Sequence, residues 1–336
     1  MIFKRSSIAR ASIIAVFAAS TLFADLRIGA HHWPTPNTSF LDGRSLGHFA
    51  QPTRSGALQS ALWGCVRNGG SRFHEGIDLK ALSRDQKGEA TDAIFAFDKG
   101  AVQYVNRDPS KSSYGRYIVI EHSHWMPCLV TIYAHLAQVP SRFAPGTSVS
   151  AGERIATMGR SASYAIPKER AHLHFEVGLW LGPAFQKWYD VQNFDTPNDH
   201  GVYNGMNILG LDVWTLFNAI RDGKVYSVND YLGTLPTAVS VRVWNASIPD
   251  LLRASPELMV NTVLPADHAG WEIDFSVSGV PLRFQALSAA DRSGSGITQL
   301  AFQNSRLLAS NSCVSLVRSG KPSPRLNSLL RRLFID

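Results

Sequence analysis

Two histidines separated by one residue stand in the stretch 171–177, whose sequence is AHLHFEV. In a β-strand, His172, His174 and Glu176 would point to one face and the apolar residues between them to the other. Histidine is the commonest metal ligand in proteins and the usual general base near neutral pH. The pair could therefore share a site in which one imidazole binds a metal ion and the other transfers protons, although this spacing alone is a weak signal.

A second group of candidate ligands lies in the stretch 72–79, RFHEGIDL, where His74 and Asp78 are four residues apart. That spacing puts them on one side of either a strand or a helix. The stretch begins like the helical HExxH motif, but Asp78 stands where the second histidine would be. Gly76 and the lack of an amphipathic continuation favour a strand or a tight loop. Imidazole and carboxylate donors together suit zinc.

The remaining histidines have no such pattern of possible metal ligands near them in the sequence. His135 ends an expected strand and has apolar neighbours. His122 and His124 form another pair separated by one residue, but they stand where a strand gives way to Pro127, so we interpret them as loop residues that at most line a groove. No partner pattern accompanies the others, which are expected at the surface: His31, His32, His48, His200 and His268.

The segments that must position these side chains are short and apolar, and turns rich in aspartate, glycine and proline separate them. This pattern is typical of a β-rich domain. The expected strands are 62–67, 93–97, 101–105, 117–121 and 129–135. Beyond residue 195 we expect helices at 213–221 and 248–260 and strands at 238–244, 271–277 and 282–286. Residues 205–336 contain no catalytic constellation that we can identify.

The chain of 336 residues is long enough for two modest domains. Residues 1–24 have the pattern of an export signal, because basic residues precede an apolar run shorter than the ~20 residues of a membrane-spanning helix. We expect cleavage after Ser20 or Ala24, no membrane span in the mature protein, and a location in the periplasm, the cell envelope or outside the cell. An uncleaved anchor is the alternative. Residues 25–57, rich in Pro, His, Ser and Gly, are expected to form an extended arm or a loosely packed cover.

The formal charge of +7 is concentrated at the two ends, because residues 1–24 and 305–336 together carry more positive charge than the whole chain. The body between them is not basic, so nucleic acid is not an expected partner. The basic tail could touch an anionic envelope polymer or lipid head groups, but we prefer a solvated helix end. Cys65, Cys128 and Cys313 allow one disulfide in an oxidising compartment, and the sequence does not choose among the three pairings.

Five stretches, taken in order, together resemble the lysostaphin/LytM-type family of zinc metallopeptidases, which cut peptidoglycan cross-bridges. They are SALWGCVR at 60–67, HEGID at 74–78, YAHL at 133–136, GERI at 152–155 and HLHFE at 172–176. The H-x-x-x-D spacing alone would be a weak signal, but with YxHL and HLHFE in order the signal is strong. The resemblance covers roughly residues 60–180. It implies a compact, mainly antiparallel β-sheet domain at 58–195 with a groove across it.

The resemblance also implies roles for five residues. His74, Asp78 and His174 would bind one Zn2+ per chain, and His135 and His172 would be the catalytic pair beside it. Three protein ligands leave one zinc position for water, whose pKa zinc lowers towards ~7. Either catalytic histidine could take the proton of that water while the other supports the oxyanion or protonates the leaving amine.

Neighbouring residues carry weaker expectations. Glu176 could orient a ligand imidazole or form a surface salt bridge. Glu75 is excluded as a general base, because strand alternation would turn it away from His74. Arg67 and Tyr133 are expected to be structural.

These expectations describe an exported zinc endopeptidase that acts on the peptide stems or cross-links of peptidoglycan. The alternatives are a catalytically silent adaptor that binds and activates other cell-wall hydrolases, and a secreted zinc peptidase that acts on proteins.

The loop 160–171 lacks the family's Gly-rich turn, so the preference for particular substrate side chains is open. Residues 25–57 could cover and inhibit the groove, and 196–336 would form a β-rich accessory region with some helix. The oligomeric state and the bond cleaved do not follow from the sequence.

Overall fold

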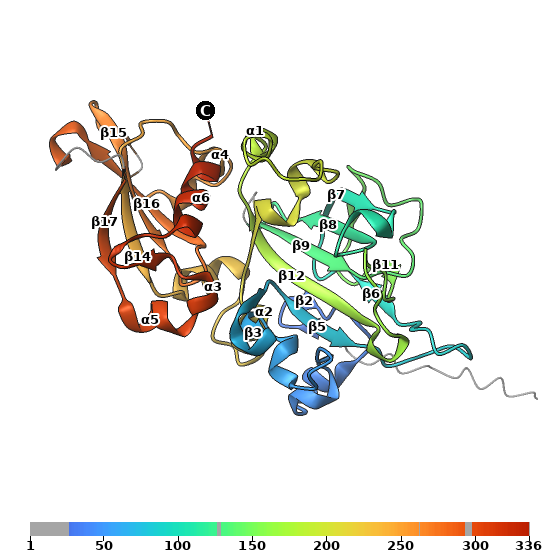
Figure 1. Ribbon diagram of the computed structural model, residues 1–336. Helices are drawn as coiled ribbons and strands as arrows, with labels where there is room; N and C mark the ends of the chain where they lie inside the picture. The colour runs from blue at the N-terminus through green and yellow to red at the C-terminus, as the bar shows by residue number, and fades with distance from the viewer. Residues whose placement is uncertain (1–26, 126–128, 262, 293–297, 336) are drawn as a thin grey trace, which may run out of the picture.

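The computed structural model describes residues 27–125, 129–261, 263–292 and 298–335. The expected signal segment and Cys128 lie outside these residues. The described chain is mainly β, with antiparallel sheets and short helices, as the sequence predicts. Figure 1 shows two β-rich halves side by side, with the chain's last helix between them. In the described part of the chain, no helix has both the length and the apolar character needed to cross a membrane.

An antiparallel sheet of seven strands forms the first half, and β12 is the longest of them (Figure 1). β12 pairs with β9 along one edge, while β5 and β13 share its other edge. The seven strands are β5 (Ile77–Lys80), β7 (Gly100–Asn106), β8 (Tyr117–Glu121), β9 (Leu129–Ala134), β10 (Ser148–Val149), β12 (His172–Trp180) and β13 (Ile208–Gly210). The smaller pairs are β1 (Arg27–Ile28) with β2 (His31–His32), β3 (Gly64–Arg67) with β4 (Arg72–His74), and β6 (Ala93–Phe95) with β11 (Arg154–Thr157).

The alternation along β12 separates the hydrophobic core from the polar face. Leu173, Phe175 and Val177 have no exposed surface and belong to the main buried cluster. The opposite face carries His172, His174 and Glu176, and a smaller cluster of tyrosines and aliphatic residues around Tyr117 packs beside it. Residues in a strand alternate between faces, so burial of the apolar set fixes the direction of the polar set.

The segment expected to be a loosely packed arm contributes to the core instead. Trp33 and Phe40 are fully buried, stack at 4.9 Å between ring centroids, and pack on Phe217. Phe217 in turn stacks on Phe175, so the two aromatic residues lie on the face of the sheet away from His174. Burial of large aromatic side chains stabilises such a segment despite its proline content.

Residues 49–51 also extend the sheet beside β5. The backbone carbonyl of Phe49 accepts a hydrogen bond from the Lys80 N–H at 2.8 Å, and the Gln51 N–H donates to the Asp78 carbonyl at 2.9 Å. The arm therefore braces the strand that carries Asp78.

Two histidines expected at the surface are buried. His31 is 3% exposed, stacks on Phe97 and lies 2.9 Å from Asp98. His200 is 8% exposed and contacts the Tyr104 hydroxyl at 3.0 Å. The interpretation as surface residues was wrong because neither partner is near in sequence. His48 is exposed as expected.

The second half contains a four-stranded antiparallel sheet in the order β16-β15-β14-β17. Its strands are β14 (Val239–Val243), β15 (His268–Phe275), β16 (Pro281–Ser288) and β17 (Thr298–Gln303), and a short pair follows, β18 (Val317–Arg318) with β19 (Lys321–Pro322). The helices of the chain are α1 (Phe185–Asp190), α2 (Val213–Arg221), α3 (Val228–Thr234), α4 (Asp250–Ala254), α5 (Ser305–Ser310) and α6 (Pro324–Leu333). One buried cluster runs through both halves and includes both Phe175 and Trp271.

The two helix predictions for this region had different outcomes. The helix at 213–221 is α2, with the expected bounds. The helix predicted at 248–260 is wrong in extent, because α4 ends at Ala254 and a separate 3-10 turn covers Pro256–Leu258. Proline lacks an N–H and restricts the residue before it, so the helix stops there.

A disulfide joins Cys65 of β3 to Cys313 in the C-terminal region, which decides among the three pairings left open by the sequence. The bond connects positions 248 residues apart. It therefore ties the C-terminal region to the hairpin that precedes the His74–Asp78 segment.

We expect the double variant Cys65→Ser/Cys313→Ser to be less stable by about 2–5 kcal/mol, because the disulfide restricts the unfolded chain. Urea unfolding under oxidising conditions measures this difference. Reductant should lower the stability of the wild type to that of the double variant and leave the variant unchanged. Equal stability of both proteins under oxidising conditions would contradict the prediction.

Candidate metal centre and active site

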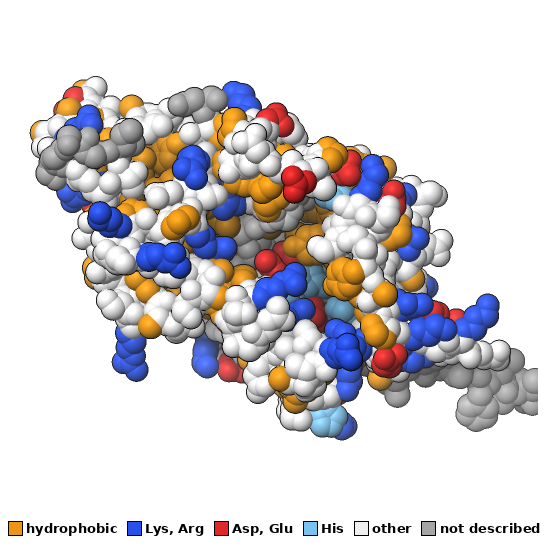
Figure 2. Space-filling view, viewed as in Figure 1, with side chains coloured by type: hydrophobic (Ala, Val, Ile, Leu, Met, Phe, Trp, Pro, Cys, Tyr) orange, Lys and Arg blue, Asp and Glu red, His pale blue; other side chains and the backbone are white. Residues whose placement is uncertain are grey.

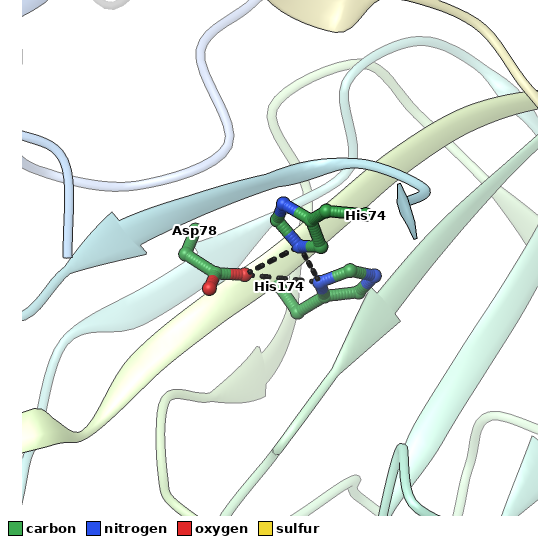
Figure 3. A group of neighbouring side chains, drawn as sticks. All are labelled: His74, Asp78 and His174. Atoms are coloured by element: carbon green, nitrogen blue, oxygen red, sulfur yellow. Dashed lines mark hydrogen bonds and ion pairs between the residues drawn. The ribbon is translucent and has the colours of Figure 1, made fainter. Parts of the chain in front are cut away.

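Strand register brings together the three residues expected to bind a metal. On β12, His174 lies directly opposite Asp78 of β5 and Ala134 of β9. His74 ends β4, and its Nε2 lies 3.0 Å from Nδ1 of His174 and 3.2 Å from Oδ1 of Asp78 (Figure 3). The distance from His174 Nδ1 to Asp78 Oδ1 is 3.0 Å. One donor atom from each residue thus points to a common centre, and all three residues are buried.

The outer hydrogen bonds of the two imidazoles define which nitrogen faces the centre. Nδ1 of His74 lies 2.7 Å from the backbone carbonyl of Leu62, and Nε2 of His174 lies 2.7 Å from Oε1 of Glu176. Each of these oxygens accepts a hydrogen bond from an imidazole N–H, so the inner nitrogen is the one that carries the lone pair whenever the ring is neutral. Two lone pairs and a carboxylate oxygen at about 3 Å need a proton or a cation between them, and this donor set fits a zinc ion.

The contacts within this cluster also shift the pKa values of Asp78 and His174. Burial alone would raise the pKa of Asp78, but His74, His172 and His174 outweigh it and hold that pKa well below its usual range. Burial alone would lower the pKa of His174, yet its hydrogen bonds to Asp78 and Glu176 raise it to about 10. The centre therefore stabilises positive charge.

His135 and His172 lie beside this centre. Their ring centroids are 4.7 Å apart, and that of His135 is 5.9 Å from the ring of His174. Nδ1 of His135 donates to the Ser161 carbonyl at 2.9 Å, and Nδ1 of His172 donates to the Arg170 carbonyl at 2.7 Å. Nε2 of each ring is therefore the nitrogen that can accept a proton, and Nε2 of His172 lies 3.6 Å from Oδ2 of Asp78. Burial lowers the pKa of both imidazoles, which keeps them neutral and able to accept that proton.

The backbone at His135 supports its position. Its φ of +60° is in the left-handed region, which non-glycine residues rarely adopt. Such conformations cluster at functional sites, where surrounding contacts hold them. Here the His135 N–H donates to the Tyr114 carbonyl at 2.9 Å as the chain leaves β9.

The structure decides between the two expectations for Glu176. It is 1% exposed, so the surface salt bridge was wrong, and its carboxylate contacts the imidazole of His174, the candidate ligand. The hydroxyl of Tyr114 donates to the same carboxylate oxygen at 2.6 Å. Sequence reasoning did not find Tyr114, because no motif marks it.

Arg67 has a role beyond the structural one expected for it. Its Nη2 lies 2.5 Å from Oδ2 of Asp78, while Oδ1 of the same carboxylate faces the centre. The arginine therefore fixes the carboxylate's rotation. Tyr133 is structural as expected, since its buried hydroxyl accepts the Phe97 N–H at 2.8 Å.

The position of Glu75 differs from the one predicted from the sequence. Glu75 lies between β4 and β5 rather than within a strand, so alternation does not turn it away, and it lines a cavity together with Tyr114. Burial and the nearby charge of Glu176 raise the pKa of Glu75. Figure 2 shows a hollow with acidic and histidine atoms at its floor and Lys and Arg atoms near its rim.

The second histidine pair does not join the centre. His122 is fully buried, stacks on Trp125 and lies 2.8 Å from the Thr131 hydroxyl. His124 lies 3.2 Å from Asp98. His122 and His124 lie in the loop after β8, as expected, but His122 is fully buried and does not line a groove, and its contacts are structural.

We expect Glu176→Gln to lower metal affinity by about 10–100-fold, because loss of a negative partner makes the His174 imidazole a weaker donor. Titration against a chromogenic chelator measures this affinity. Tyr114→Phe, which leaves the carboxylate in place, should have a smaller effect in the same direction. Unchanged affinity in Glu176→Gln would contradict the assigned orientation of His174.

Comparison with known proteins agrees with this geometry. Residues 72–183 match Peptidase family M23. This segment contains His74, Asp78, His135, His172 and His174. It is thus an M23 peptidase domain, and the expected lysostaphin/LytM-type class is confirmed. No curated protein matches the chain.

Several solved structures are similar to parts of this chain. A zinc-containing peptidase from Vibrio cholerae is 28% identical over 31% of this chain and 26% of its own, with a TM-score of 0.24. Csd3 from Helicobacter pylori is 22% identical over 36% of this chain and 27% of its own, with a TM-score of 0.26. The lysostaphin catalytic domain from Staphylococcus simulans is 16% identical over 52% of this chain and 95% of its own, with a TM-score of 0.30. The chain thus spans about a quarter of the length of the first two.

Proposed function

We propose that this protein is an exported zinc endopeptidase that hydrolyses peptide bonds in the stems or cross-links of bacterial peptidoglycan. The observation that carries the proposal is the convergence of His74, Asp78 and His174 on one centre, with two further neutral histidines beside it. The M23 match and the donor set of two imidazoles and a carboxylate support the choice of metal.

In this proposal, Nε2 of His74, Nδ1 of His174 and Oδ1 of Asp78 would hold one zinc ion. When bound, zinc supplies Lewis acidity, which lowers the pKa of water and polarises a carbonyl group. Arg67 and Glu176 keep the ligand side chains oriented through their contacts with Asp78 and His174.

His135 and His172 carry the proton transfers. Each presents an unprotonated Nε2, because its Nδ1–H is donated to a backbone carbonyl. One imidazole takes a proton from the attacking water, and a protonated imidazole then donates to the oxyanion or to the leaving amine. Their similar burial and similar hydrogen bonding do not distinguish the two roles.

The test is incubation of the mature protein with purified sacculi, with and without a chelator. We expect new free amino groups and altered muropeptides only in the metal-loaded sample. Absence of both changes would contradict the endopeptidase function. A metal-free protein that instead stimulates a cell-wall amidase would support the adaptor alternative, and cleavage of proteins but not sacculi would support the secreted peptidase.

A further inference from the structure

A cavity of about 1050 Å3 lies between the peptidase domain and the C-terminal region. Its wall on the peptidase side includes Glu75, which follows the ligand His74, and Tyr114, which shares Glu176 with the ligand His174. Its opposite wall comes from α6 and from the segment around Cys313. The cavity therefore reaches sequence or hydrogen-bond neighbours of two candidate ligands on one side and the accessory region on the other, although none of the five candidate site residues lines it.

The sequence of α6 places a polar face on this cavity. Leu326, Leu329, Leu330 and Leu333 are buried in the core. Arg325, Ser328 and Arg332, spaced by three and four residues, lie on the other face and line the cavity. The helix begins at an N-cap, Ser323, and the Cys65–Cys313 disulfide lies close before it in sequence. The arginine-bearing face is thus held in place rather than left on a mobile tail.

The two arginines sit among aromatic rings. The guanidinium carbon of Arg325 is 5.7 Å from the ring centroid of Phe73, the neighbour of His74. That of Arg332 is 5.3 Å from the ring centroid of Trp188, and its Nη1 donates to the Met206 carbonyl. Planar guanidinium groups stacked on rings keep N–H donors available at their edges.

Within the described chain neither arginine is paired with an acid, although Arg325 is exposed to solvent and Arg332 is half-buried. Among the same described residues, Nε of Arg332 is buried without a hydrogen-bond partner. Lys111, in the same cavity, is already paired with Asp199, and Arg72 adds a further cation to the wall. Burial and the charge of Arg325 lower the pKa of Arg332 to about 10. Partial desolvation also lowers the pKa of Arg325, and the charge of Glu75 opposes that shift only in part. A carboxylate in the cavity could accept hydrogen bonds from either of these unpaired guanidinium groups.

We propose that Arg325 and Arg332 form a subsite for a carboxylate group of the peptide substrate, so that the accessory region is the second wall of the substrate cleft. This inference rests on the proposed endopeptidase function. A peptide held at the metal centre would pass Glu75 and Tyr114 and place its free carboxylate against α6. Arginine suits this role, because its fork of donors matches a carboxylate.

The test compares two forms of one oligopeptide released from peptidoglycan, the first with free carboxylates and the second with these converted to carboxamides. kcat/KM is measured for both forms with the full-length protein, Arg325→Gln, and Arg331→Gln. Arg331 is an exposed arginine on the same helix that does not line the cavity, so it controls for net charge. Arg332→Gln is a second variant, with thermal melting as a check that its contacts with Trp188 and Met206 are not needed for folding.

We expect the wild type to prefer the free acid and Arg325→Gln to lose about tenfold in kcat/KM for that form. The carboxamide form should be cleaved equally by the wild type, Arg325→Gln and Arg331→Gln. Equal cleavage of both forms by the wild type, or an unchanged preference in Arg325→Gln, would overturn the subsite.

A protein that is not an endopeptidase would give a different result in this test. If the wild type cleaves neither form, Kd for fluorescently labelled versions of the same two peptides decides the inference. Tighter binding of the free acid, weakened about tenfold by Arg325→Gln and not by Arg331→Gln, would support the subsite without hydrolysis. Equal Kd values for the two forms, or for the wild type and Arg325→Gln, would overturn it.

Discussion

His174→Ala is expected to abolish metal binding and, with it, hydrolysis of sacculi. The substitution removes one of three converging donors and leaves Asp78 and Glu176 as buried carboxylates without their shared imidazole. Loss of a direct ligand should cost more than the roughly 10–100-fold in affinity that an outer partner costs. Metal analysis after dialysis should find about one zinc per chain in the wild type and none in the variant.

His124→Ala is the matched control for this loss. His124 also belongs to a pair of histidines separated by one residue, but its Nε2 contacts Asp98 and not the metal centre. This variant should keep its zinc and its activity. Zinc retained at full occupancy in His174→Ala would contradict the assigned ligand set.

His135→Asn is expected to keep zinc and to lose about 10²–10⁴-fold in kcat, the usual contribution of a general acid or base. Asparagine is chosen because it tolerates the left-handed backbone conformation of His135 better than most residues. The variant should therefore fold with the metal ligands undisturbed. Metal content and the rate of amino-group release are measured on the same preparation.

His172→Asn should show a loss of similar size, and the double variant should lose less than the product of the two, because the pair acts as a unit. Wild-type rates in either single variant with full metal content would remove that histidine from the catalytic pair.

The β-sheet and the clustering of His74, Asp78 and His174 could be predicted from the sequence, because their signals are local or are carried by motifs. Alternation along 172–176 separated His174 from Phe175, and the strand register then set His174 opposite Asp78. The helix at 213–221 was predictable from its apolar spacing, and its N-cap Asp212 accepts a hydrogen bond from the Thr215 N–H.

The contacts that complete the site could not be predicted, since each joins residues that are distant in sequence or that lack a distinctive motif. Tyr114 reaches Glu176 across 62 residues, and no spacing rule connects them. Arg67 reaches Asp78 through a turn between two short hairpin strands. Glu75 was excluded by an alternation that does not apply, because it stands between strands.

The arm was misjudged for a related reason. Proline, histidine, serine and glycine at 25–57 suggested loose packing, but Trp33, Phe40 and Phe49 bury large aromatic surfaces that composition alone did not weigh. Their packing on the face away from His174 offers no support for an inhibitory cover over the centre.

The most direct test of the central claim is a zinc titration of the metal-stripped protein on purified sacculi, followed by release of free amino groups. We expect no release of amino groups without metal and a rise to a plateau at about one zinc per chain. The His174→Ala variant should release no amino groups at any zinc concentration. Release that is independent of added zinc, or that is unchanged in His174→Ala, would contradict the central claim.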